Sequence, residues 1–165
     1  MTTDARTRMD PPVPEAGTSA PPGAGRRSLL VLRVVAVLHA VVMLAQPVLA
    51  GRYLDGAVYA IALHRENATV VAAFDAAQLV CAVVFAWRGH GRRWPIWLSL
   101  AVAVGVEVQV GFGYASLLFV HVPLGVSLIV AQVVGVVWLF RDATAVARPA
   151  RRRGADVHPV GGDRP

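Results

Sequence analysis

Two histidines, His64 and His121, each stand at the start of a long apolar segment, where they could provide a pair of metal-binding imidazoles. His64 precedes Trp87 by 23 positions and His121 precedes Phe140 by 19, which in a helix correspond to about 34 Å and 29 Å. The two rings are therefore expected at similar depth on helices that run the same way. Such a pair can supply both axial ligands of a b-type haem. Alternatively, both residues hydrogen-bond lipid headgroups or cap their helices.

The two halves of the chain resemble each other around these histidines. Gln46 precedes His64 and Gln109 precedes His121, and each glutamine is followed by a glycine near the end of its own apolar segment. Each half thus predicts a hairpin in which a glutamine-bearing helix is followed by a helix that starts at histidine. We interpret this as a duplication, although shared apolar composition also explains part of the match. Gln46 and Gln109 are expected to contact the two histidines rather than the cofactor itself.

A second group of polar residues is expected near the middle of the membrane. His39 follows Ser28 by 11 positions, Glu107 follows Ile96 by 11, and Asp75 precedes Trp87 by 12, so all three lie about 17–18 Å from the same boundary. A histidine and two carboxylates could bind a divalent metal or relay protons. The interpretation we favour is a buried polar network that fixes helix register, with His39, Asp75 and Glu107 facing one bundle interior.

Gln78 and Gln132 lie slightly nearer that boundary than the three ionisable residues. Both are long polar side chains in otherwise apolar segments, so they too are expected to face the interior of the bundle.

Four apolar segments must position these residues. They cover about 28–50, 62–87, 96–119 and 121–140, in a chain of 165 residues that is 56% hydrophobic and 16% charged. Each reaches the roughly 20 residues that cross a bilayer as a helix, and a lipid environment favours helices over open sheets. The sequence predicts an all-α bundle of four transmembrane helices within residues 28–141, built from two repeated hairpins.

The two ends of the chain differ from this apolar centre. Residues 1–27 are rich in proline and residues 142–165 are rich in arginine and glycine, and neither end can bury enough apolar surface to fold. Both are expected to be disordered. The Arg26–Arg27 pair also resembles a twin-arginine signal, so cleavage after residue 50 is an alternative for the start.

The arginines predict the orientation. They are concentrated before the first helix, between the second and third helices, and after the fourth helix, and the chain contains no lysine. Because cytoplasmic segments are enriched in basic residues, both termini are expected in the cytoplasm and the protein in the plasma membrane. The basic segments are expected to contact anionic lipid headgroups rather than nucleic acid.

Other catalytic signals are weak. Cys81 is the single cysteine, which excludes an internal disulfide, and the sequence has no CxxCH, GxSxG, HExxH or P-loop motif. The sequence therefore favours a protein that is not an enzyme without excluding an enzyme.

The segments AQPVLAGRYLDG, LHRENA, VEVQVGFG and VHVPLGV resemble a family of small bacterial four-helix membrane proteins. They are also similar to one four-helix half of haem A synthase, in which a glutamine-rich helix precedes a helix-start histidine in each hairpin. The resemblance covers about residues 30–140 and implies His64 and His121 as haem ligands.

Two functions follow as hypotheses. The first is a cytochrome b-like protein that holds haem b between the second and fourth helices, near the outer face, for electron transfer or haem handling. Its partner would be a redox protein or a second copy of itself. The second is a non-catalytic membrane subunit, or a small transporter, that uses His39, Asp75 and Glu107 for protons or metal.

Overall fold

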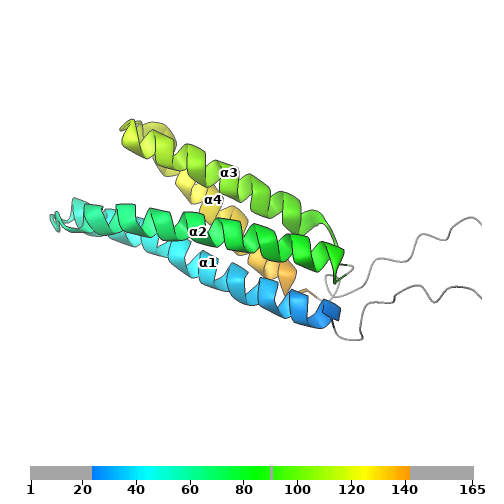
Figure 1. Cartoon of the computed structure of the whole chain (residues 1–165). Coiled ribbons are helices and arrows are strands. Elements are labelled where there is room, and N and C mark those ends of the chain that lie inside the picture. The colour runs from blue at the N-terminus through cyan, green and yellow to red at the C-terminus, as the bar shows by residue number, and fades with distance from the viewer. Residues whose placement is uncertain (1–23, 90, 142–165) are drawn as a thin grey trace, which may run out of the picture.

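The computed structural model describes residues 24–89 and 91–141, and within these ranges it contains four helices and no strand (Figure 1). The helices are α1 (Ala24–Leu54), α2 (Ala60–Trp87), α3 (Trp94–Tyr114) and α4 (Leu118–Leu139). Each is long and apolar enough to cross a membrane. The predicted all-α fold with four membrane-spanning helices is therefore confirmed.

Helix α1 is longer than the sequence predicted. It starts at Ala24, so residues 24–27, which we had expected in the disordered tail, are helical. Ala24, Arg26 and Arg27 are good helix formers and favour this extension, although Gly25 between them is a poor one. The helix also continues through Pro47 to Leu54 and carries Arg52 in its last turn. A positive charge at this end of a helix interacts favourably with the helix dipole. Residues 1–23 and 142–165, the rest of the predicted tails, lie outside the described residues.

Short connections pair the helices into two antiparallel hairpins. Residues 55–59 join α1 to α2, and residues 115–117 join α3 to α4. Gly56 has a φ of 93° in the first connection and Ser116 has a φ of 57° in the second, so each turn uses one residue in the left-handed region. Such short loops force consecutive helices to lie side by side and antiparallel.

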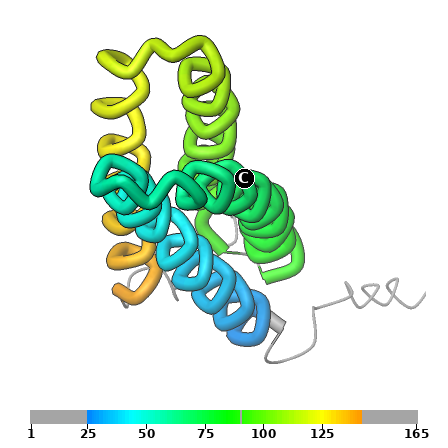
Figure 2. Tube along the Cα trace, turned by 90° about the vertical axis from the view of Figure 1, so that its left-hand side faces the viewer, coloured from blue at the N-terminus to red at the C-terminus, as the bar shows by residue number. Residues whose placement is uncertain are grey.

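The two hairpins are close together at one end of the molecule and diverge toward the other (Figure 1). We call the first the basic end, because it contains the start of α1, the α2–α3 connection and Arg141. We call the other the histidine end, because His64 and His121 lie there. Viewed from the histidine end, the α3–α4 connection stands away from the α1–α2 connection (Figure 2).

The interior has three layers. An apolar cluster fills the basic end and contains Leu29, Leu32, Ala36, Ala82, Phe85 and Leu139. A second cluster lies toward the histidine end and contains Met43, Val71, Val102, Val106 and Leu128. Between the two lies a buried polar layer, which consists of His39, Asp75, Gln78, Ser99 and Gln132. Every helix contributes at least one residue to this polar layer.

The outer surface of the bundle is apolar along its length. Many large hydrophobic side chains are more than half exposed, among them Leu30, Val80, Val104 and Val130. An exposed apolar surface of this extent would be unstable in water, whereas lipid chains solvate it. The arrangement is therefore that of a small multi-pass membrane protein.

Candidate functional site

His64 and His121, one from each hairpin, lie close together at the histidine end. His64 belongs to α2 and His121 to α4, and both side chains are half-buried. Their ring centres are 6.4 Å apart and the ring planes make an angle of 56°. Two residues 57 positions apart in the sequence are thus brought together, as the predicted equal depth required.

His121 is held by a reciprocal pair of hydrogen bonds with Gln109. Its Nδ1 lies 2.9 Å from the backbone carbonyl oxygen of Gln109, and the Gln109 side-chain amide donates to the His121 carbonyl at 2.7 Å. A carbonyl oxygen can only accept, so Nδ1 of His121 carries the proton. The other ring nitrogen, Nε2, is then left with a lone pair, which is the form that binds metals.

His64 is held by Gln46 in the same manner. Its Nδ1 lies 3.2 Å from the Gln46 backbone carbonyl. When the Gln46 amide is oriented to satisfy its surroundings, its nitrogen donates to the His64 carbonyl at 3.2 Å and lies 3.0 Å from Nδ1. Nδ1 can donate to the carbonyl or accept from this amide; the first arrangement matches His121 and leaves Nε2 of His64 free.

The separation of the rings suits a single metal between them. Imidazole nitrogens bind transition metals at about 2 Å, so a metal between two rings separates their centres by about 6 Å. The angle between the planes is compatible with this, because each ring can rotate about its own metal–nitrogen bond. Gly113 makes room on one side, since a Cβ atom there would lie 3.0 Å from Cε1 of His121.

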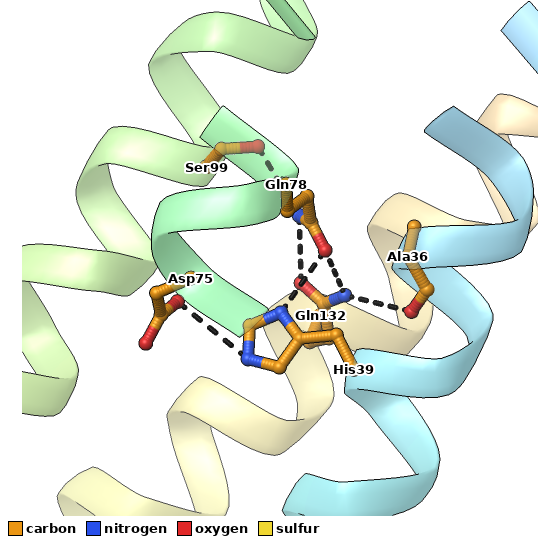
Figure 3. A network of polar contacts seen from close by, with 6 residues as sticks. All are labelled: Ala36, His39, Asp75, Gln78, Ser99 and Gln132. Atoms are coloured by element: carbon orange, nitrogen blue, oxygen red, sulfur yellow. Dashed lines mark hydrogen bonds and ion pairs between the residues drawn. The ribbon is translucent and has the colours of Figure 1, made fainter. Parts of the chain in front are cut away.

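The polar layer forms a second, separate cluster (Figure 3). Gln78 and Gln132 pair through both ends of their amides, at 2.7 Å and 3.2 Å. Gln78 also donates to Ser99 at 3.1 Å, and Gln132 donates to the Ala36 carbonyl at 3.0 Å. The network links all four helices, and it bridges α2 and α4 directly.

His39 and Asp75 lie beside this amide pair. Nδ1 of His39 is 3.0 Å from the Gln78 side-chain oxygen, and Nε2 is 3.6 Å from an Asp75 carboxylate oxygen. The His39 side chain is fully buried and Asp75 is 5% exposed. The His39 ring is stacked on Phe74, with ring centres 6.2 Å apart. The predicted mid-membrane contact between these two ionisable residues is therefore present.

Glu107 does not join them, and our expectation that it faces the bundle interior is wrong. Its side chain is exposed, although Val106 beside it is 5% exposed and packs in the core. Successive helix positions differ by about 100°, so equal depth along α3 does not imply the same face. Among residues 24–89 and 91–141, no three histidine, cysteine, aspartate or glutamate side chains gather as a metal site.

Ser99 and the Ala36 carbonyl are partners that the sequence analysis missed. Ser99 is 3% exposed and lies on the buried stripe of α3 that continues at Val102 and Val106. This spacing of three and four residues marks one helix face. The spacing thus identifies Ser99 as an inward-facing hydroxyl at the level of the glutamines.

No protein-family model, curated protein or solved structure matches this chain. The similarity to haem A synthase therefore remains a prediction.

Proposed function

We propose that this protein is a small membrane cytochrome that binds a b-type haem between His64 and His121 at the histidine end. The observation that carries the proposal is the pair of imidazoles from different hairpins, with ring centres 6.4 Å apart. When bound, haem would supply a centre that takes up and releases one electron.

The donor chemistry supports this proposal. Low-spin haem takes two neutral imidazoles, and each must present Nε2 while Nδ1 donates elsewhere. His121 meets this requirement through the Gln109 carbonyl, and His64 meets it in the arrangement in which its Nδ1 donates to the Gln46 carbonyl. The two hydrogen bonds to the backbone also fix the ring planes, so the side chains lose little rotational freedom when they bind the haem.

The role of each residue follows from its contacts. His64 and His121 would be the axial ligands, and the backbone of Gln46 and Gln109 would orient them. The Gln109 amide ties the His121 backbone to α3, so it acts on ring position through the helix rather than on the ligand directly. Gly113 would leave space for the ring of His121.

The direct experiment is an absorption spectrum of the full-length protein, purified in detergent from cells supplied with haem. We expect a Soret band and a sharp reduced band typical of two histidine ligands, at one haem per chain. His64→Ala and His121→Ala should each abolish the low-spin spectrum, whereas His158→Ala, the control that removes a histidine from the C-terminal tail, should keep it. Protein that folds but contains no haem would refute the proposal.

The orientation forms part of the same proposal. The basic end carries Arg26, Arg27, Arg88, Arg92, Arg93 and Arg141. By the positive-inside rule it faces the cytoplasm, which places the histidine end at the outer face of the plasma membrane. A reporter fused within residues 88–93 should therefore be active only in its cytoplasmic form, and an externally active fusion there would overturn this orientation.

The alternative of a transporter built on the polar layer has less support. It required three ionisable side chains at one place, but Glu107 is exposed on α3 while His39 and Asp75 are buried. In the polar layer the Gln78 and Gln132 side chains also hydrogen-bond to each other. This arrangement suits a fixed structural network better than a path for a divalent metal.

A further inference from the structure

The His39–Asp75 pair contains buried polar atoms that the rest of the polar layer leaves without partners. Nε2 of His39 and both carboxylate oxygens of Asp75 are buried and make no hydrogen bond within the described part of the chain. All other side chains of the layer are bonded to one another or to the backbone. Because leaving buried polar groups unpaired is unfavourable, these atoms point to something that binds between them.

The amide network fixes the tautomer of His39. Its Nδ1 faces the side-chain oxygen of Gln78, and that oxygen also accepts a bond from the Gln132 amide. An amide oxygen can only accept, so Nδ1 carries a proton in every charge state of the ring. A neutral His39 therefore presents the lone pair of Nε2 toward Asp75, 3.6 Å away.

Two acceptors then face each other unless one further proton lies between them. We propose that His39 and Asp75 form a binding site for a single proton in the middle of the membrane. The proton resides on Nε2 of His39 and faces the ionised Asp75 carboxylate, so with the proton bound the pair is neutral overall. Without it, a full negative charge is left in the apolar interior, which is unfavourable.

The charges around the pair are few. On α3 the single charged residue is Glu107, which is exposed and has the same sign of charge as an ionised Asp75. Helix α4 contributes the uncharged Gln132 and has no ionisable residue after His121. Helix α1 contributes His39 itself, and its next charge, Arg33, is bonded to the Leu139 carbonyl at 2.8 Å. Within residues 24–89 and 91–141, no cation besides His39 is therefore placed to neutralise Asp75.

A proton fits this site better than a metal ion does. A metal needs more ligands than one ring nitrogen and one carboxylate, and Glu107 is not turned toward the pair. The site also differs from the proposed haem site, since Asp75 lies 11 positions, or about 17 Å along α2, from His64. The inference consequently does not depend on haem.

Nitrogen NMR of ¹⁵N-histidine-labelled full-length protein in detergent tests the proposal, because protonated and unprotonated ring nitrogens have distinct shifts. The His39 signals are identified by their loss in His39→Gln. As the pH is raised, we expect Nδ1 to stay protonated and Nε2 to lose one proton in a single step. Asp75→Asn should weaken proton binding by at least about tenfold, a change of about one pH unit.

Two further variants provide controls. Glu107→Gln removes a carboxylate at the same depth and should move the step by less than about half a pH unit. Asp75→Glu retains the carboxylate and should retain the step. If the asparagine variant does not fold, Asp75→Ser takes its place as the variant without a carboxylate. These comparisons separate the contribution of this carboxylate from a general change in charge.

Three results would overturn the proposal. The first is wild-type protein in which Nε2 of His39 has no proton at any pH where the protein is folded. The second is an Asp75→Asn variant whose His39 signals titrate as in the wild type. The third is a stoichiometric change of the His39 signals on adding zinc, which would identify a metal site. Because none of these readouts uses haem, absence of haem would refute the proposed function without affecting this test.

Discussion

Replacing Gln78 by leucine removes the side chain at the centre of the polar layer, and the structure predicts a large loss of stability. His39 Nδ1 would lose its acceptor, and the side-chain oxygen of Gln132 would lose the amide that donates to it. Ser99 would lose its donor as well. Stranding a buried polar group costs about 1–3 kcal/mol, but helix–helix hydrogen bonds in membranes average about 0.6 kcal/mol. We therefore expect a decrease of about 2–4 kcal/mol in the free energy of unfolding.

The assay is equilibrium unfolding in mixed micelles, with helix content followed by circular dichroism as the denaturing detergent is increased. Val80→Leu provides the matched control, since Val80 is on the same helix and is 62% exposed. The double variant Gln78→Leu, Gln132→Leu should lose less than the sum of the single variants, because each removes the other's partner. Equal unfolding midpoints for Gln78→Leu and Val80→Leu would refute the network as a source of stability.

Three other substitutions test separate contacts. Gly105→Ala places a Cβ atom 2.5 Å from a leucine of α4, so its unfolding free energy should fall by about 1–3 kcal/mol; Gly111→Ala, with open space around it, should change nothing in the same assay. Gly113→Ala places a Cβ atom 3.0 Å from the His121 ring, so if haem binds as proposed, its absorption spectrum should change while the helix content by circular dichroism stays constant. Arg33→Ala removes a bond to the end of α4 and a contact with an aromatic ring 4.9 Å away, and should cost about 1–2 kcal/mol in the unfolding assay; an unchanged midpoint would show that neither contact matters.

The sequence predicted correctly which residues lie close together wherever this depended only on their depth along a helix. Long apolar segments set the number of helices, and short connections set their antiparallel pairing. Counting residues placed His64 level with His121, and His39 level with Asp75. In both cases the structure brings the residues together, because each also lies on a face that turns toward the interior.

Depth alone failed for Glu107, where the angle around the helix decides. Its neighbour Val106 occupies the inward face, and one step along the helix turns Glu107 away from it. In a membrane helix almost every face is apolar, so the contrast between faces that identifies the buried side in soluble proteins is weak. Hydrogen bonds to backbone carbonyls, such as that from Gln132 to Ala36, have no sequence signal, since any residue can supply the carbonyl.

Because the two hairpins are close together at the basic end and diverge toward the histidine end, a small change in the angle between them gives its largest displacement at the histidines. From Arg88 to His64 the arm of α2 measures about 36 Å, so a rotation of about 1° between the hairpins shifts one histidine against the other by about 0.6 Å. Ligand geometry around a metal tolerates only about 0.5 Å. The Gln78–Gln132 bridge lies part-way along this arm, so we expect that repacking there would change the separation of the two histidines without contact with either ring.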